Sequence, residues 1–174
     1  MWSPEDFILH HAARRSLCPP GGTYHITDIS KGAMTVAKAQ IDRRARYARW
    51  VALLHEEVKL IAKPHTRIVA IGREVRALLE RHSFDRDVTA VMHYSAQASR
   101  YRDAAVEGRR PEFLAFASTL SMEDIVATAD AVMREHSVPF TLSMETITRL
   151  RMAKLSNSRK KLAFIYLTAF AELR

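Results

Sequence analysis

The sequence predicts an α/β fold with a small, mainly parallel sheet and a C-terminal extension made of helices. Short apolar runs alternate with amphipathic stretches over the first part of the chain, which is typical of parallel strands joined by right-handed helical crossovers. The last third carries helix signals instead. A chain of 174 residues that is 48% hydrophobic can bury its own core. We therefore expect an α/β core in residues 1–110 and a helical extension packed on it in residues 111–174.

The N-terminal segment contains a predicted helix and the first predicted strand. Residues 4–15 favour a short helix, which residues 18–22 (CPPGG) should end because proline lacks an amide donor and glycine adds backbone freedom. Residues 23–29 (TYHITDI) are mostly β-branched or aromatic, so a strand is expected over residues 23–28. Its end carries Asp28, Ser30 and Lys31.

A long helix and two further strands follow. Apolar residues at three- and four-residue steps predict an amphipathic helix over residues 36–62, with arginines near its start and Lys63-Pro64 at its end. Residues 67–71 (RIVAI) have the compact apolar character of a buried parallel strand, and a helix should follow Gly72. Residues 88–92 (VTAVM) are the next predicted strand, which opens directly onto residues 93–95 (HYS). We expect this last strand to pair with residues 67–71.

The C-terminal extension is expected to hold three helices. Residues 121–124 (SMED) are a plausible start for a helix over residues 125–135, and Ser143 and Ser156 are candidate caps for two more. Basic side chains of the terminal helix either contact phosphates or form a solvated face, of which the second is the commoner. They are Lys154, Arg159, Lys160 and Lys161.

Composition restricts the classes of function. The formal charge is +8, and residues 1–110 hold 19 basic against 12 acidic side chains, which favours a nucleic acid or a phosphorylated ligand as partner. A protein that is merely soluble and basic is the alternative. No apolar run is long enough to span a membrane and no signal peptide is evident, so a cytoplasmic protein without membrane contact is expected. Cys18 is the only cysteine and the histidines lack metal-binding spacing, so neither a metal nor a cofactor is expected.

Three segments together resemble a known family. They are TYHITDISKG (23–32), LLHEEVKLIAKPHTRIVAIGREVRALL (53–79) and VTAVMHYS (88–95). In this order and spacing they resemble the later motifs of the uracil-DNA glycosylase superfamily, in particular its family 4 type. The resemblance covers about residues 23–100, and it implies a three-layer fold in which strand ends converge on a pocket for a base flipped out of DNA.

The resemblance also implies site residues. His93 stands where a family histidine stabilises charge on the departing base, and Asp28 where an asparagine reads the uracil edge. Ser95, with the Tyr94 amide beside it, stands where a serine contacts phosphate. The family's first motif, which positions the attacking water, has no match upstream of residue 23, and an ionised aspartate accepts hydrogen bonds but cannot donate one to uracil. Further expected nucleic-acid contacts are Lys31, Arg100 and Arg102.

Three functions remain open on the sequence. The first is a glycosylase-like protein that binds DNA or a flipped base, with weak or lost activity. The second is a non-enzymatic module that binds nucleic acid or protein on the same scaffold. The third is an α/β enzyme for a phosphorylated small molecule, supported only by Gly72-Arg73 after a strand. The target base and the oligomeric state are not determined by the sequence.

Overall fold

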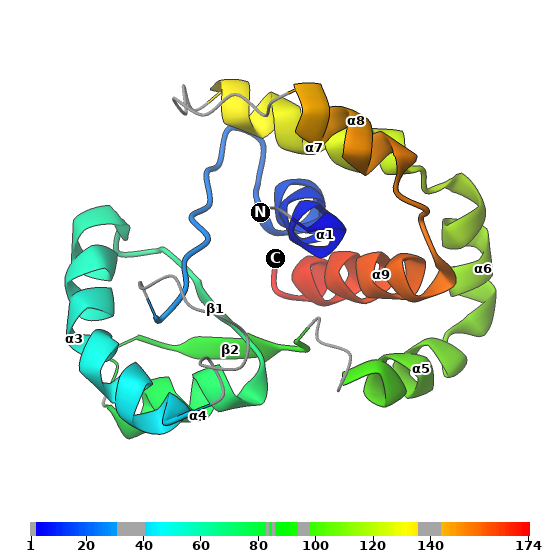
Figure 1. Cartoon of the computed structure of the whole chain (residues 1–174). Coiled ribbons are helices and arrows are strands. Elements are labelled where there is room, and N and C mark those ends of the chain that lie inside the picture. The colour runs from blue at the N-terminus through cyan, green and yellow to red at the C-terminus, as the bar shows by residue number, and fades with distance from the viewer. Residues whose placement is uncertain (1–2, 31–40, 83, 85, 94–97, 136–143) are drawn as a thin grey trace. The chain divides into compact units, whose positions relative to one another are not determined.

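The computed structural model describes residues 3–30, 41–82, 84, 86–93, 98–135 and 144–174 (Figure 1). Helices make up 67% of it, and a two-stranded parallel sheet gives it a general α/β character. The chain divides into two compact units. Unit 1 combines residues 1–24 with residues 94–174, and unit 2 is formed by residues 25–93.

Unit 2 contains the sheet. Strand β1 (Ile68–Ile71) pairs in parallel with β2 (Val88–Val91), and the register runs from Ile68 opposite Val88 to Ile71 opposite Val91. Helix α4 (Arg73–Arg81) is the crossover between them, and helix α3 (Arg43–Ile61) precedes β1 (Figure 1). The two strands predicted at residues 67–71 and 88–92 are thus confirmed, and so is their pairing.

The core of unit 2 explains why α3 forms where it does. Val51, Leu54 and Val58 recur at three- and four-residue steps, so they share one face of the helix, and all three are buried. They cluster with Ala70 of β1 and with buried leucines of α4. The helix ends at Ile61, shortly before Pro64 as predicted, while residues 36–40 of the predicted helix lie outside the described residues.

The predicted first strand was wrong. Residues 23–28 form no strand, and the sheet of the described residues contains β1 and β2 alone. The segment is held to α3 by side chains, because His25 Nε2 lies 2.7 Å from Glu57 Oε1 and Ile29 is buried in the α3 core. A β-branched and aromatic composition favours a strand only where a neighbouring strand offers a ladder, and here α3 takes that place.

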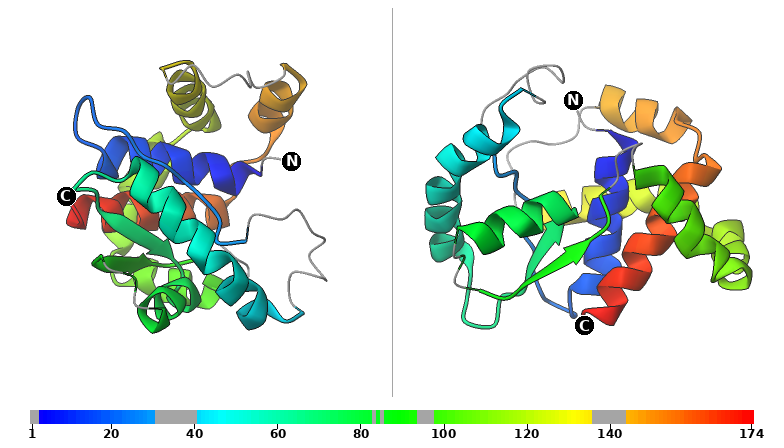
Figure 2. Two further views of the ribbon diagram at one scale, coloured as in Figure 1. Left: turned by 90° about the vertical axis from the view of Figure 1, so that its left-hand side faces the viewer. Right: turned by 90° about the horizontal axis from the view of Figure 1, so that it is seen from below.

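Unit 1 is helical and begins with the N-terminus. Helix α1 (Pro4–Ala12) starts with a capping box in which Ser3 and Asp6 bond to each other's backbone amides, and a π-helical segment, η1 (Ala13–Leu17), continues it. This confirms the predicted N-terminal helix and its end before residues 18–22. Helix α1 packs against α9 (Asn157–Glu172), as all views show (Figures 1 and 2), and buries Phe7 and Ile8.

The two compact units divide after residues 24 and 93, not at residue 110. The N-terminal helix belongs to unit 1 because its apolar face is covered by C-terminal helices, and residues 94–110 belong there too. Two helices that had no sequence prediction, α5 (Ser99–Glu107) and α6 (Arg110–Thr119), precede α7 (Met122–Glu135) and α8 (Met144–Met152). Ser156 caps α9 as predicted, whereas Ser143 lies outside the described residues.

Basic side chains of α9 make internal contacts. Arg159 Nε lies 2.9 Å from Glu5 Oε1, the Lys160 ammonium donates to the Ala117 carbonyl, and Lys161 pairs with Asp103. These contacts join α9 to the segments around it. None of the described helices has the length and apolar character that crossing a membrane requires.

A buried histidine links α1 to α7. His11 is 1% exposed, and its Nδ1 lies 3.0 Å from the Thr128 hydroxyl, which itself donates to the Asp124 carbonyl. Since the hydroxyl proton is used there, Nδ1 must carry the imidazole proton, and Nε2 is buried with no hydrogen-bond partner among the described residues. Burial, helped by Arg15, lowers the pKa of His11 from 6.5 to about 4.

This pKa predicts acid sensitivity. Between pH 6.5 and 4 the unfolded chain binds a proton at His11 that the folded chain resists, so the free energy of unfolding should fall by up to about 3 kcal/mol on acidification. Urea denaturation followed by circular dichroism at several pH values measures this. The variant His11→Leu should flatten the dependence, because Thr128 keeps its bond to Asp124, and an unchanged slope in His11→Leu would contradict the assignment. His65→Gln, at an exposed histidine, is the control.

Candidate functional site

The carboxyl ends of β1 and β2 bring two predicted features together. Gly72 follows β1, and its amide donates to the Val91 carbonyl of β2 at 2.8 Å. Its φ of +103° belongs to a region that residues with a side chain rarely adopt. A Cβ at this position would lie 3.3 Å from the Cβ of His93, so the absence of a side chain lets the histidine lie against the strand end.

This edge of the sheet is also the start of α4. Gly72 is the N-cap of the helix and provides no side-chain cap, so the first amides of α4 and the positive end of its dipole face the strand end. Arg73 is the first residue of the helix, and the half-buried His93 lies beside Gly72. Such an arrangement offers hydrogen-bond donors to an anionic group, in agreement with the rule that α/β sites form at carboxyl ends of strands.

Three of the other residues predicted from the resemblance, Asp28, Arg100 and Arg102, lie within the described part of the chain. Asp28 is exposed in a segment without regular structure, so it does not follow a strand end. Arg100 and Arg102 belong to α5 in unit 1, where the Arg100 guanidinium lies 4.8 Å from the centre of the Tyr101 ring. Arg102 is only 5% exposed, which removes it from the predicted nucleic-acid surface. Three further predicted residues, Lys31, Tyr94 and Ser95, lie outside the described residues.

A second candidate feature of unit 2 is the arginine cluster of α3, defined as Arg43, Arg44, Arg46 and Arg49. Three of these four side chains are exposed, and the fourth, Arg46, donates to the Ile41 carbonyl at 2.8 Å. Arg43, Arg44 and Arg49 make no ion pair or hydrogen bond with side chains anywhere in the described part of the chain. The sequence had placed these arginines at a helix start, but the residues alone give no sign that they lack partners.

Several basic side chains of unit 1, unlike those of the α3 arginine cluster, form ion pairs. Six basic side chains form ion pairs within the unit: Arg109 with Glu112, Arg110 with Glu107, Arg134 with Asp130, Arg151 with Glu123, Arg159 with Glu5 and Lys161 with Asp103. The sequence of unit 2, residues 25–93, by contrast contains 13 basic and 8 acidic side chains. The excess of positive charge that is free to attract a polyanion is therefore greatest on unit 2.

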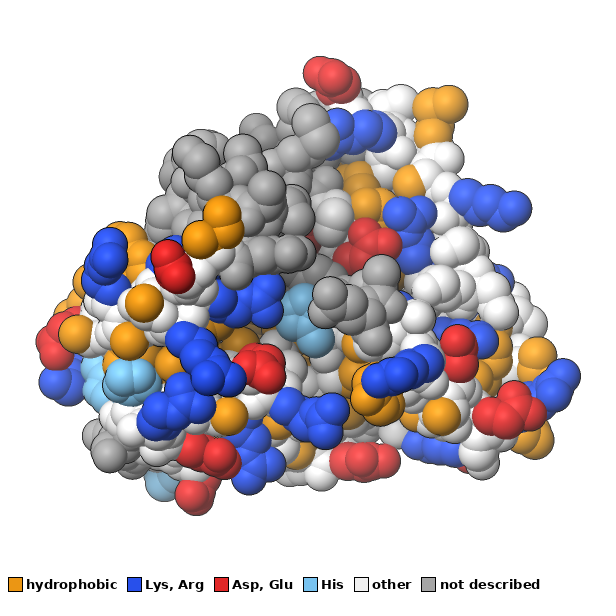
Figure 3. Space-filling model, turned by 60° about the horizontal axis from the view of Figure 1, so that its bottom comes forward, with side chains coloured by type: hydrophobic (Ala, Val, Ile, Leu, Met, Phe, Trp, Pro, Cys, Tyr) orange, Lys and Arg blue, Asp and Glu red, His pale blue; other side chains and the backbone are white. Residues whose placement is uncertain are grey.

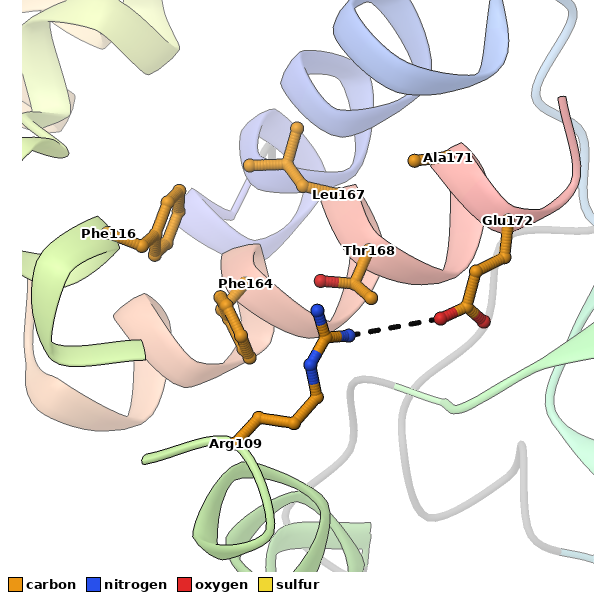
Figure 4. Close-up of a pocket in the computed structure, with 7 residues that line it drawn as sticks. All are labelled: Arg109, Phe116, Phe164, Leu167, Thr168, Ala171 and Glu172. Carbon is orange, nitrogen blue, oxygen red and sulfur yellow. Dashed lines mark ion pairs between the residues drawn. The ribbon is translucent and has the colours of Figure 1, made fainter. Parts of the chain in front are cut away.

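Unit 1 has a hollow of about 500 Å³ between α6 and α9 (Figure 4). Phe116, Phe164 and Leu167 line it, and Arg109 lies at its edge, 3.8 Å from Glu172. A hydrogen bond to Glu112 raises the pKa of Arg109, and the two glutamates neutralise its charge. The lining thus has neither an uncompensated charge for an anion nor an acid and base placed together for chemistry.

Neither a metal site among the described residues nor a similar protein points to a function for this chain. Within the part of the chain that the structure describes, no three histidine, cysteine, aspartate or glutamate side chains form a group suited to a metal ion. Comparison with protein-family models, with curated proteins and with solved structures finds no match to this chain.

The conformation of Gly72 and its closeness to His93 predict that a side chain at this position lowers stability. Gly72→Ala forces a side chain into a φ of +103° and against His93, so it should lower the free energy of unfolding by about 2 kcal/mol and shift the His93 ring signals in NMR spectra. Gly108→Ala is the matched control, since Gly108 has a φ of −63° and its Cβ would meet nothing closer than 4.0 Å. Equal effects of the two substitutions would contradict the close approach of Gly72 and His93.

Proposed function

We propose that this chain is a nucleic-acid-binding protein that contacts phosphates through unit 2, chiefly through the arginine cluster of α3. The observation that carries the proposal is that Arg43, Arg44 and Arg49 are exposed and make no ion pair among the described residues. An arginine guanidinium without a protein partner is available for bidentate contact with phosphate oxygens. Figure 3 shows Lys and Arg side chains on the part of this face that unit 2 forms, with Asp and Glu side chains among them.

Charge spacing favours a polymeric anion over a small phosphorylated ligand. Three unpaired guanidinium groups lie on about two turns of one helix, all of them exposed, and they point to more than one side of the helix. A small anion contacts one or two donors in a hollow, whereas a strand of nucleic acid offers a phosphate row along which several arginines release counterions. This supports a nucleic acid against the phosphorylated small molecule that was the third function.

A glycosylase-like pocket at the β1 and β2 ends is the second candidate. It is supported by the pairing of two family-like segments, with Gly72 directly against His93. The remaining family-like segment, described over residues 23–30, does not join the sheet, and Asp28 is exposed in a stretch without regular structure. We therefore favour the non-enzymatic binding module over an active glycosylase. The three-layer fold of the glycosylase family belongs only to the glycosylase candidate.

The first test is DNA binding at two salt concentrations. The double variant Arg43→Ala/Arg44→Ala should weaken binding of labelled single- and double-stranded DNA at low salt, and it should lower the slope of log affinity against log salt by about 1 to 2. Fluorescence anisotropy with fixed DNA measures both quantities.

A matched control has the same loss of charge on unit 1. Arg110 and Arg134 are exposed and already paired with Glu107 and Asp130, which stand three and four residues before them in the chain, so Arg110→Ala/Arg134→Ala should change the affinity and the salt slope little. Equal weakening by the two double variants would mean that net charge alone drives binding, and no binding at low salt would end the proposal.

The second test concerns chemistry, and we expect at most feeble uracil excision. Water activation and electrostatic help to the leaving base together contribute several powers of ten, and only the His93 part of that arrangement is supported. A uracil-containing oligonucleotide is incubated with the protein and then cleaved at abasic sites by hot alkali. Robust cleavage that His93→Ala abolishes would establish the glycosylase candidate, whereas cleavage indifferent to His93 and Asp28 would place the pocket elsewhere.

A further inference from the structure

The outward side of α3 carries a stripe of apolar and charged side chains that nothing in its own unit covers. The stripe consists of residues that lie within about 100° of one another around the helix axis, and all of them are exposed. Leu53 is 47% exposed and Leu60 is 86% exposed, and both lie on the side of the helix opposite its packed core face. The α3 stripe is formed by Ala45, Arg49, Ala52, Leu53, Glu56 and Leu60.

The order of residues along the stripe is symmetric about its centre. Steps of four, three, one, three and four residues separate its members, so the positions mirror each other about the bond between Ala52 and Leu53. The residue types are complementary across that centre. Small Ala45 mirrors large Leu60, Ala52 mirrors Leu53, and the cation of Arg49 mirrors the anion of Glu56.

We propose that α3 pairs with the α3 of a second copy of this chain, antiparallel and centred between Ala52 and Leu53. A two-fold axis at that point places each residue opposite its mirror position, so every large side chain meets an alanine and each Arg49 meets the Glu56 of the other copy. A parallel pairing would place Arg49 against Arg49 and Leu60 against Leu60. Charge complementarity therefore selects the antiparallel arrangement.

A hollow lies where the pairing needs one. It has a volume of about 340 Å³ at the start of α3 and is lined by Ile41, Asp42, Ala45, Arg46 and Arg49. Ala45 is the mirror position of Leu60, so the most exposed leucine of one copy enters the hollow of the other. Ile41 is 63% exposed beside this hollow and adds apolar surface for the incoming side chain.

The charged pair is available for this contact. Arg49 makes no ion pair among the described residues, and Glu56 pairs only with Lys59, three residues along the helix, where both side chains are more than half exposed. That pair contributes little in water. Because one helix pair covers less surface than a standard protein interface, the expected dimer is reversible with a dissociation constant in the micromolar range.

Sedimentation velocity of the full chain, without nucleic acid and over about 1 to 500 µM, tests the pairing. The wild type should form a concentration-dependent dimer. Arg49→Glu and Glu56→Arg should each weaken it at least about tenfold, because like charges then face each other twice, while the double variant Arg49→Glu/Glu56→Arg should recover the wild-type affinity to within about threefold.

Leu60→Gln should also weaken the dimer at least about tenfold, since an exposed side chain can be changed without disturbing the monomer. Leu114→Gln on α6, where the leucine is 58% exposed, is the matched control and should have no effect. Circular dichroism confirms that each variant folds. A monomer at every concentration, a dimer indifferent to Arg49→Glu and Leu60→Gln, or a double variant no better than the single ones would each overturn the proposal.

Discussion

The parallel pairing of β1 with β2 is the constraint on which unit 2 depends. Parallel strands require a crossover, and α4 provides it in nine residues directly after Gly72. The Gly72 amide donates to the Val91 carbonyl and so adds one more hydrogen bond at the carboxyl ends of the two strands. His93, two residues after Val91, therefore lies against Gly72. Helix α3 then covers the strands and α4 with one face, which leaves its opposite face and its arginines toward solvent.

Basic side chains have different roles in the two units. Several in unit 1 stabilise the fold through ion pairs, whereas the unpaired arginines of α3 in unit 2 are available to bind a ligand. In unit 1 the cations hold helices together, as when Arg159 bonds to Glu5 across the α1 and α9 contact and Lys161 to Asp103 of α5. These ion pairs neutralise part of the positive charge from which the sequence predicted a polyanion as partner. In unit 2 the arginines of α3 keep their charge, so the location of unpaired charge is more informative than the overall +8.

Local patterns predicted the elements whose apolar spacing or capping residue is visible in the sequence itself. The apolar run before Gly72, the periodic face of α3 and the Ser156 cap all produced the expected structure. The segment 23–28 was misjudged because strand propensity cannot reveal whether a neighbouring strand is present, and α5 and α6 were missed because their mixed surfaces lack a strong apolar face. The absence of partners for Arg43 and Arg44 depends on residues distant in sequence, which no local pattern contains.

The two roles proposed for α3 share Arg49 but otherwise use different sides of the helix. Arg43 and Arg44 precede the α3 stripe along the axis and point away from it by about 100° or more, so pairing through the stripe leaves both guanidinium groups in solvent. In the antiparallel pair the two copies of Arg43 would lie at opposite ends, about 28 Å apart at 1.5 Å per residue. A polyanion long enough to reach both ends would then be held at two places, and the second contact would form at a high effective concentration. Weak pairing of α3 and weak phosphate contacts would thus reinforce each other, because each copy brings its own arginines to the same nucleic acid.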